Sequence, residues 1–355
     1  MKEIVNKIKD RIIDGNASLL DALKVMDGIG KKILFVFEED SFVGILTIGD
    51  IQRAIIKKND TAVSVSKILD RNKIMATEGE SLEVIKDRMM ELRAECMPVV
   101  NAGGELVNVY FWSDLFIKDD LQQKREPIDL PVVIMAGGQG TRLRPLTNIM
   151  PKPLIPIGEK TILEEILDRF ESVGCHKFYM SVNYKADMIA YYLNSLEHDY
   201  NIELFSEPKP LGTIGSVSML KDKIKSPFFV SNCDIVIDQD FRDVYDYHRN
   251  NGNDITIVTA VKSMSIPYGV IYTGDNGLLT DIVEKPQKSY MINTGVYILE
   301  PEMINEIPEG EFYHITDLIM AVKNRGGKVG CFPVSEMSWK DMGDWNEYLR
   351  RIGQR

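Results

Sequence analysis

The sequence of 355 residues is poor in cysteine, and its four cysteines stand far apart. Their positions fit none of the short spacings by which cysteines bind a metal ion. Buried free thiols in a reducing compartment explain such residues best. The cysteines are Cys96, Cys175, Cys233 and Cys331.

Long apolar runs and an excess of positive charge are also missing. No segment approaches the ~20 apolar residues that a membrane-spanning helix needs, and the first residues, MKEIVNKIKDRIID, lack the apolar centre of a signal peptide. The formal net charge is −11 and the sequence has no basic stripe, which argues against nucleic acid and anionic membranes as partners. We therefore expect a cytoplasmic protein that binds neither nucleic acid nor a membrane.

What is present is the composition of an ordinary globular protein, with 44% apolar and 27% charged residues. At this length two domains are a better expectation than one. The segment Asp119–Asp129, DDLQQKREPID, is polar, lacks apolar periodicity and contains Pro127, which is typical of a linker. We place the first domain at residues 1–120, the linker at 121–129 and the second domain at 130–355.

One segment, Leu130–Pro156, combines the features of a phosphate site. It opens with an apolar run to Met135, which is typical of a strand buried on both faces. In the following Ala136–Gly140, three glycines let the backbone turn tightly and approach a ligand, and their N–H groups can form a nest for anionic oxygens. Positive charge follows closely, at Arg142, Arg144 and Lys152.

The glycine pattern excludes two commoner phosphate-binding loops. A P-loop requires Lys-Ser/Thr directly after its last glycine, and none follows Gly140. A dinucleotide fingerprint requires a third glycine where Leu143 stands. The pattern instead resembles the signature of the sugar-1-phosphate nucleotidyltransferases, Gly-Gly-x-Gly-Thr-Arg-Leu, Pro-Leu-Thr and Pro-Lys-Pro-Leu. The three parts stand at Gly137–Leu143, Pro145–Thr147 and Pro151–Leu154.

Strands and helices alternate after this signature. Two segments have helical spacing, Thr161–Val173 and Asp187–Leu196. Each is followed by a strand pattern, at Lys177–Asn183 and at Asn201–Phe205. The alternation predicts an α/β fold with a mostly parallel sheet, helices on both faces and ligands at the carboxyl ends of the strands. The resemblance implies a Rossmann-like, mostly parallel α/β/α nucleotidyltransferase domain.

Further motifs recur in the family in the same order, so the resemblance covers roughly Leu130 to Tyr348. They are EPKPLGTIGS (Glu207–Ser216), FFVSNCD (Phe228–Asp234), Tyr268–Val270, Glu284–Pro286 with Asn293–Gly295, and WKDMGDW (Trp339–Trp345). The chain departs from the family at Thr161, where proline is usual, and at Cys233, where a small residue is common.

The reaction that the resemblance implies needs no general base. A sugar 1-phosphate attacks the α-phosphorus of a nucleoside triphosphate, and pyrophosphate leaves. The attacking phosphate is already mostly ionised at neutral pH, because its second pKa is about 6. The absence of a Ser–His or Cys–His constellation agrees with this chemistry, which requires charge neutralisation and in-line positioning.

Mg²⁺ is the expected cofactor, since it takes one or two carboxylates together with phosphate oxygens. Asp234, at the end of a predicted buried strand, and Asp341 match the metal ligands of the family. Asp344 lies outside the matching position, and a role as a helix N-cap explains it.

The resemblance assigns the other site residues. Arg142 and Lys152, with Asp234, form the catalytic set that holds the triphosphate and stabilises charge on the α-phosphate. The residues expected to contact the nucleotide are Ala136, Gly137, Gly138, Gly140, Thr141, Leu211, Gly212 and Asn232. Those expected to contact the sugar phosphate are Gly269, Glu284, Lys285, Asn293 and Thr294, with Lys285 on the phosphate and Glu284 on the sugar hydroxyls.

Residues 1–120 contain an internal repeat of helix, strand, turn, strand and helix. The first copy comprises Ser18–Met26, Ile33–Phe37, Glu38–Ser41, Phe42–Leu46 and Asp50–Lys57. The second comprises Ser81–Leu92, Met97–Val100, Asn101–Gly104, Glu105–Phe111 and a helix that opens at Ser113 and Asp114. This repeat resembles a pair of CBS domains, which are α+β modules.

The most telling string of the repeat is Gly44–Asp50, GILTIGD, in the first copy. The resemblance implies that Thr47 and Asp50 contact the phosphate and ribose of an adenine nucleotide. The second copy departs at Asn108 and Phe111 but keeps Asp114, and helix N-caps explain both aspartates as well. The CBS pair predicts a homodimer or higher homo-oligomer, an adenine-nucleotide sensor, or both.

Two more specific resemblances indicate which nucleotide base and which sugar the protein uses. The turn Glu-x-x-Pro-Leu-Gly-Thr-x-Gly is similar to that of mannose-1-phosphate guanylyltransferases. The combination of CBS pair and transferase resembles bacterial glucosamine-1-phosphate guanylyltransferases of legionaminic acid synthesis. We expect GTP and glucosamine 1-phosphate, with mannose-1-phosphate guanylyl transfer and a thymidylyl- or uridylyltransferase on a hexose 1-phosphate as alternatives.

A rival of another class is a non-catalytic nucleotide-sensing protein. Loss of any member of the catalytic and metal set would favour it. Arg142, Lys152, Asp234 and Asp341 are all present.

Overall fold

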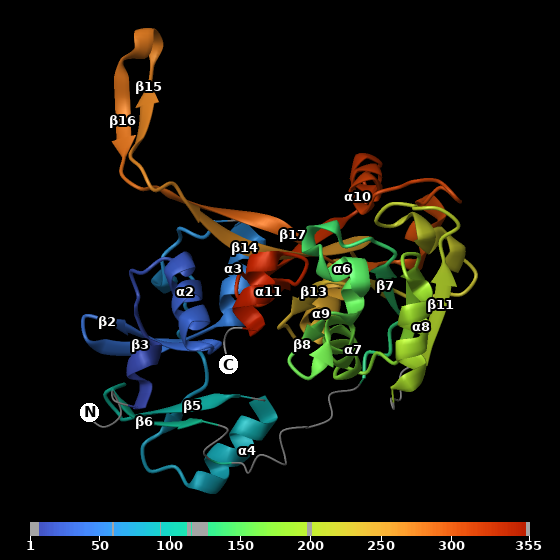
Figure 1. Ribbon diagram of the computed structural model, residues 1–355. Helices are drawn as coiled ribbons and strands as arrows, with labels where there is room; N and C mark the ends of the chain where they lie inside the picture. Colours follow the sequence, from blue (N-terminus) through green and yellow to red (C-terminus); the bar gives the residue numbers. More distant parts are fainter. Residues whose placement is uncertain are drawn as a thin grey trace. The chain divides into compact units, whose positions relative to one another are not determined.

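The computed structural model describes residues 7–58, 60–92, 94–111, 115, 127–196 and 201–352. The chain forms two compact units, Met1–Arg125 (unit 1) and Glu126–Arg355 (unit 2), which are drawn in Figure 1. Among the described residues, none of the helices has the length and apolar character needed to cross a membrane.

Unit 1 contains two three-stranded sheets with the same topology, which confirms the predicted repeat. In each sheet the first strand pairs parallel with the second, and the third returns antiparallel. The strands are β1 (Ile12–Asp14), β2 (Ile33–Glu38), β3 (Ser41–Thr47), β4 (Ala76–Thr77), β5 (Cys96–Val100) and β6 (Leu106–Phe111). The helices are α2 (Leu19–Ile29), α3 (Ile48–Lys58) and α4 (Leu82–Leu92), with the 3₁₀ turns η1 (Lys9–Arg11) and η2 (Val65–Lys67).

The two repeats of unit 1 share one apolar core. Phe35 and Ile45 from the first sheet are buried together with Cys96 and Val109 from the second. Neither three-stranded sheet has enough apolar surface to form a core alone, so the repeats stabilise each other. The helix predicted to open at Ser113 and Asp114 lies outside the described residues.

Unit 2 is built on a seven-stranded sheet with the order β11-β10-β7-β12-β17-β14-β18. All neighbours pair parallel except β17, which is antiparallel to both β12 and β14. The strands are β7 (Val132–Ala136), β10 (Lys177–Val182), β11 (Asn201–Ser206), β12 (Phe228–Asn232), β14 (Ile255–Ser265), β17 (Gln287–Leu299) and β18 (Val329–Ser335). The mostly parallel sheet predicted from the sequence is confirmed.

Helices cover both faces of this sheet, which makes unit 2 a three-layer α/β/α domain. Val132 and Ile134 of β7 belong to one buried cluster, and the residue between them, Val133, belongs to the other. The helices are α6 (Leu146–Ile149), α7 (Ile162–Glu171), α8 (Ala186–Ser195), α9 (Phe241–Asn251), α10 (Ile315–Asn324) and α11 (Trp345–Ile352). The 3₁₀ turns are η4 (Thr141–Leu143), η5 (Lys152–Leu154), η6 (Gly215–Leu220), η7 (Asp275–Gly277) and η8 (Pro301–Glu306).

Thr161, the first departure from the family pattern, has a clear local role. Its hydroxyl accepts the N–H of Glu164 at 3.2 Å, and the Glu164 carboxylate accepts the N–H of Thr161 at 2.7 Å. This reciprocal capping box starts α7 and satisfies two N–H groups that would otherwise lack partners. The α7 helix then packs Phe170 against Phe241 of α9, with ring centroids 4.3 Å apart.

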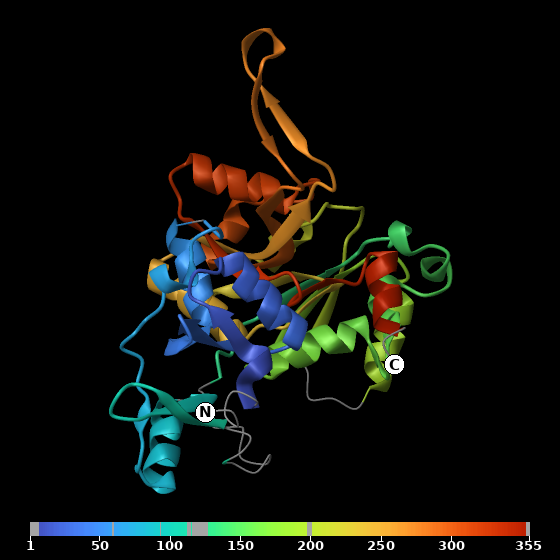
Figure 2. The ribbon, with the colours of Figure 1, turned by 90° about the vertical axis from the view of Figure 1, so that its left-hand side faces the viewer.

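Three short sheets also lie in the described part of unit 2. They are β8–β9 (Pro156–Ile157 with Lys160–Thr161), β13–β19 (Ile235–Ile237 with Trp339–Asp341) and β15–β16 (Val270–Thr273 with Leu279–Val283). The β15–β16 hairpin connects β14 to β17 and projects away from the rest of unit 2, as both Figure 1 and Figure 2 show.

Candidate active site

The glycine loop predicted from the sequence follows β7 directly. Gly140 has a φ of +62°, and a Cβ there would lie 2.8 Å from Cγ2 of Thr147 and 3.2 Å from Cβ of Lys152. The Thr147 hydroxyl donates to the carbonyl of Gly140 at 2.9 Å. Only glycine fits this turn without strain, so Gly140 brings the loop onto the segment that carries Lys152.

Asp234 and Asp341, which are far apart in sequence, meet through the β13–β19 sheet. Strand β12 ends at Asn232 and not at Asp234 as predicted, because the chain turns at Cys233 and Asp234 to begin β13. Ile235 stands opposite Asp341 in the β13–β19 ladder, and the N–H of Met342 donates to the Asp234 carbonyl at 2.9 Å. The sheet therefore holds two carboxylates beside the glycine loop.

Two cations pair with these carboxylates. The Lys152 ammonium donates to Oδ2 of Asp234 in a close contact, and only 10% of each side chain is exposed. Nη1 of Arg142 lies 3.1 Å from Oδ2 of Asp341, and Nη2 lies 3.6 Å from Oδ2 of Asp234. With 61% of its side chain exposed, Arg142 closes the cluster on the solvent side.

The electrostatics of the cluster favour a charged Arg142. Burial works against the guanidinium charge, but attraction to Asp341, its hydrogen bond, and attraction to Asp234 and Asp344 together raise the pKa of Arg142. Asp344 itself caps α11 by accepting the N–H groups of Asn346 and Glu347 at 2.9 and 3.2 Å, which confirms the role expected for it. Arg142 is thus a permanent positive charge held over two carboxylates.

Cys233, the second departure from the family pattern, is not a nucleophile in this arrangement. It is buried next to Asp234, and burial raises the pKa of its thiol to about 12. A thiol with this pKa stays protonated at neutral pH and behaves as a small apolar side chain.

The second glycine turn is joined to the first by Glu207. This buried carboxylate accepts the Ser181 hydroxyl at 2.6 Å and the Leu211 N–H at 3.1 Å. A Cβ at Gly137 would lie 3.1 Å from its Oε1. Glu207 therefore connects β10, the first glycine loop and the turn that carries the predicted base-binding residues Leu211 and Gly212.

Asn232, the last predicted neighbour of the nucleotide, lies at the carboxyl end of β12. A Cβ at Gly295 of the adjacent β17 would lie 2.4 Å from Nδ2 of Asn232. The missing side chain of Gly295 thus leaves the space that the Asn232 amide occupies. The remaining predicted nucleotide contacts, Ala136, Gly138 and Thr141, lie in or next to the first glycine loop.

Asn293 and Thr294, predicted to line the sugar, lie on β17 and are already engaged in the sheet. The buried Thr294 hydroxyl donates to the Val258 carbonyl at 2.7 Å, at the point where the β14–β17 register shifts. The Asn293 carbonyl oxygen Oδ1 accepts the Tyr297 hydroxyl at 2.9 Å and the Gly295 N–H at 3.0 Å. These contacts fix the β17 bulge that precedes Gly295, the residue that lies against Asn232.

Gly269, Glu284 and Lys285 form a separate group at the base of the projecting hairpin. A Cβ at Gly269 would lie 2.9 Å from Oε2 of Glu284, and all three residues are exposed. Within the described ranges, no hydrogen bond or ion pair joins them to Arg142, Lys152, Asp234 or Asp341. The structure therefore joins the predicted catalytic and metal residues directly, whereas these three predicted sugar contacts make no direct contact of this kind with them in the described residues.

In unit 1, Thr47 and Asp50 form the capping box of α3. Asp50 is the third residue of the helix and not its N-cap, a position that Thr47 holds. Oδ2 of Asp50 accepts the Thr47 N–H at 2.8 Å and the Thr47 hydroxyl at 2.7 Å, and it also contacts the Lys73 ammonium. Burial opposes the charge, but the hydrogen bonds from Lys73 and Thr47 prevail and lower the pKa of Asp50.

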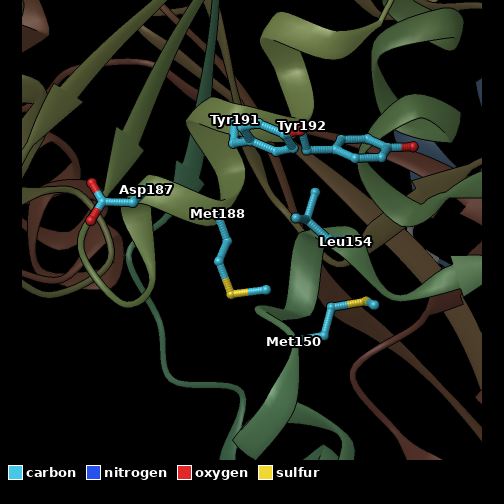
Figure 3. Close-up of a pocket in the computed structure, with 6 residues that line it drawn as sticks. All are labelled: Met150, Leu154, Asp187, Met188, Tyr191 and Tyr192. Carbon is cyan, nitrogen blue, oxygen red and sulfur yellow. The ribbon is translucent and has the colours of Figure 1, made fainter.

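A cavity of about 390 Å³ lies between α8 and the segment on either side of Lys152 that carries Met150 and Leu154. Figure 3 shows Met150, Leu154 and Met188 around it, with Tyr191 and Tyr192 from α8 and Asp187 to one side. No cation is among these six side chains, so the cavity does not suit a phosphate group.

Comparison with protein families identifies the class of unit 2. Residues 131–353 match the nucleotidyl transferase family and residues 2–57 match the CBS domain. Because the first match covers well over half of the sequence, the chain belongs to the nucleotidyl transferase family. The resemblance of unit 2 to the nucleotidyltransferases is confirmed at this level, and the resemblance to a CBS domain is confirmed for the first copy of the repeat.

The chain is similar to several mannose-1-phosphate guanylyltransferases. It is 33% identical over 229 residues to the mannose-1-phosphate guanyltransferase of Schizosaccharomyces pombe, with 62% of each chain covered. It is 37% identical over 182 residues to the mannose-1-phosphate guanylyltransferase catalytic subunit beta of Drosophila pseudoobscura pseudoobscura, with 49% of each covered. The chain thus spans between about half and two thirds of the length of these relatives.

Among solved structures, HddC from Yersinia pseudotuberculosis is similar, with 26% identity and a TM-score of 0.50. The match covers 63% of this chain and 99% of HddC, and HddC has also been solved in complex with GMP-PN.

Two residues of the site had no role in the sequence analysis. Glu207 is the first residue of the motif EPKPLGTIGS. The signal that could have identified it is a carboxylate that directly follows a predicted strand and precedes a glycine turn. Gly343 stood between Met342 and Asp344. A Cβ there would fall within 3 Å of both the Lys152 ammonium and the Asp234 carboxylate, so glycine allows the Lys152–Asp234 pair to form.

Proposed function

We propose that unit 2 catalyses Mg²⁺-dependent nucleotidyl transfer from a nucleoside triphosphate to a sugar 1-phosphate, with release of pyrophosphate. The observation that carries the proposal is the cluster of Arg142, Lys152, Asp234 and Asp341 beside the glycine loop. Family membership gives the class of chemistry, and the cluster supplies the charges that such chemistry requires.

The residues of this chain suit a reaction that depends on charge and position. The attacking phosphate needs no general base at neutral pH, since its second pKa is about 6. The glycine loop presents N–H groups to the phosphates, and Lys152 and Arg142 offset the charge that accumulates on the α-phosphate. Cations held in place by the fold stabilise charge where it develops in the transition state.

The donor set of the cluster fits Mg²⁺. Asp234 and Asp341 provide two hard carboxylate oxygens, and the described residues contain no group of three or more His, Cys, Asp or Glu suited to a metal ion. Mg²⁺ commonly binds one or two carboxylates and takes its other ligands from water and substrate phosphates, whereas zinc sites use more protein ligands. When bound, the ion would neutralise phosphate charge and orient the phosphate oxygens.

For the base and sugar we propose GTP and mannose 1-phosphate. The named relatives are mannose-1-phosphate guanylyltransferases, and HddC has been solved with a guanine nucleotide analogue. These likenesses favour mannose 1-phosphate over glucosamine 1-phosphate, the sugar that we expected first from the sequence.

A substrate matrix tests the proposal. The purified full chain is incubated with each of GTP, ATP, UTP, CTP and dTTP against mannose, glucosamine and glucose 1-phosphates, and pyrophosphate release is measured with and without Mg²⁺. We expect the highest kcat/KM for GTP with mannose 1-phosphate. Preference for dTTP or UTP would overturn guanylyl transfer, and preference for glucosamine 1-phosphate would restore the first expectation. Nucleotide binding without turnover of any pair would favour the sensor class.

A further inference from the structure

The projecting hairpin and the outer ends of the strands that carry it are unusually apolar for an exposed segment. We name residues 264–291 the apolar arm. Eleven of the 24 large apolar side chains exposed among the described residues lie in it, with 36–74% of each exposed. Scattered apolar residues are normal on a surface, but a contiguous exposed group marks an interaction site.

Both faces of the arm are apolar. In the β15–β16 ladder Ile271 stands opposite Ile282, and the neighbouring pair on the other face is Val270 with Val283. Successive side chains of a strand point to opposite faces. Both faces of the hairpin therefore carry apolar side chains. Leu278, in the turn between the two strands, is 71% exposed.

The arm also lacks the support that a hairpin needs in water. Within the described part of the chain β15 and β16 pair only with each other, so each strand keeps one open edge. A two-stranded hairpin is at best marginally stable alone, and an open apolar edge is prone to pair with another chain. The arm therefore needs a partner that covers its faces.

We propose that the apolar arms of two copies of this chain pack against each other and form a two-fold dimer contact. With on the order of 80 Å² of apolar surface exposed per side chain, the arm offers on the order of 900 Å², and a standard interface buries ~800 Å² per partner. Because these side chains lie on both faces, the arm reaches the area of a stable dimer when the second copy covers both of them. A surface that matches itself closes as a two-fold dimer.

The charges of the arm favour a second copy over other partners. The arm carries Asp275, Asp281 and Glu284 against Lys285 and Lys288, in a chain of net charge −11. It has no basic flank for an anionic membrane surface. Permanent interfaces between identical chains are more apolar than interfaces with transient partners, which fits an arm with so few charges.

The test is the mass of the full chain in solution, measured by light scattering over a range of concentrations. The double variant Ile271→Asp/Ile282→Asp places charges on one face of the arm, and Leu278→Asp places one charge in its turn. We expect the double variant to have half the mass of the wild type, and Leu278→Asp to dissociate at higher concentrations than the wild type does. Halving is also expected when unit 1 joins the chain to a different copy, since the arm contact is then one of two.

A matched control is Met219→Asp/Met320→Asp, which removes two exposed apolar side chains outside the arm. It should keep the mass of the wild type. Circular dichroism and Tm establish that each variant is folded, which we expect because the replaced side chains are exposed. Mass does not depend on turnover, so the outcome is separate from that of the proposed function.

Hydrogen exchange of the wild type supplies a second measurement. The amides of β15 and β16 should become protected as concentration rises, in step with the increase in mass. Equal masses for the wild type and the double variant would overturn the proposal. Protection that is independent of concentration would show that the same chain covers the arm. Arm-dependent binding to vesicles of neutral or anionic lipid would replace the second copy with a membrane.

Discussion

Each unit of the chain contains a buried aspartate that is paired with a lysine from a distant segment and with an exposed arginine. In unit 1 the aspartate is Asp50, which contacts Lys73 and lies 2.5 Å from Nη2 of Arg53. In unit 2 the aspartate is Asp234, which contacts Lys152 and, more loosely, Arg142. The two clusters use the same residue types, but they differ in what surrounds the carboxylate.

The surroundings indicate a structural role for Asp50 and a chemical one for Asp234. Asp50 also accepts the N–H and the hydroxyl of Thr47, so its charge is satisfied within the capping box of α3. Asp234 has a second carboxylate, Asp341, joined to it through Arg142, and a glycine loop beside it. An ion pair alone therefore says little about function, whereas a second carboxylate next to a phosphate-binding loop suggests a metal and a phosphate.

The largest expected effect separates the two aspartates. Asp234→Asn and Asp341→Asn should each lower Mg²⁺-dependent kcat by about 10³ or more, since a lost metal ligand removes several kcal/mol of transition-state stabilisation. Asp50→Asn should leave kcat unchanged. The measurement is pyrophosphate release at saturating substrates.

Asp222→Asn is a suitable control in unit 2, because the side chain of Asp222 is fully exposed. Near-normal turnover in Asp234→Asn or Asp341→Asn would remove that residue from the metal site. Equal losses in Asp50→Asn and Asp234→Asn would break the contrast between the clusters.

The arginines provide the second comparison. Arg142→Ala should lower kcat by roughly 10²–10³, which is the effect of removing one preorganised charge contact to the transition state. Arg53→Ala, at an arginine of unit 1 that is also mostly exposed, should have no effect on kcat. A loss confined to KM in Arg142→Ala would mean that Arg142 binds substrate and transition state equally.

The local patterns of the sequence predicted the first half of this site. The apolar run before Ala136 and the glycines after it gave the strand and the loop, because strand burial and tight turns depend on neighbouring residues. The repeat in unit 1 was equally visible, since each copy carries its own strand and turn pattern.

Long-range pairing was not visible in the sequence. The predicted strand through Asp234 ends two residues earlier, because β13 pairs with β19 about a hundred residues away. The bulge that engages Thr294 is a property of the β14–β17 register. The apolar residues of β15 and β16 are of the types found in buried strands, and only the structure shows that they are exposed.

Acid should distinguish the units by stability. Burial lowers the pKa of His248 in unit 2 from 6.5 to about 4, although attraction to Asp254 opposes the shift. Between these pH values the unfolded chain binds a proton that the folded chain does not, so unit 2 should lose about 3 kcal/mol as the pH falls from 6.5 to 4. The pKa of Asp50 is lowered from 3.8, so its contribution to unit 1 persists above pH 3.8 and is lost only in stronger acid.

Urea unfolding followed by segment-resolved hydrogen exchange at pH 7 and pH 5 measures this difference. Unit 2 should be the more destabilised unit at pH 5. His248→Gln should remove most of the pH dependence of unit 2, and His176→Gln, at an exposed histidine, should retain it. If unit 1 lost more stability than unit 2 at pH 5, the role given to His248 in the acid sensitivity of unit 2 would be contradicted.

The smallest expected effect concerns adenine nucleotides at Asp50. Asp50→Ala removes the capping box of α3 and the partner of Lys73, so unit 1 should lose about 1–2 kcal/mol of stability. If Thr47 and Asp50 also hold the phosphate and ribose of a nucleotide, calorimetry should detect AMP binding to the full wild-type chain and to Asp234→Asn, and none to Asp50→Ala. AMP suits the measurement because it lacks the triphosphate that unit 2 is proposed to use.

Arg53→Ala is the control, since it removes only the exposed partner of the carboxylate. No binding of AMP or ADP to the wild type, or binding that survives in Asp50→Ala, would leave Asp50 with its structural role alone, and the contrast with Asp234 would then be complete.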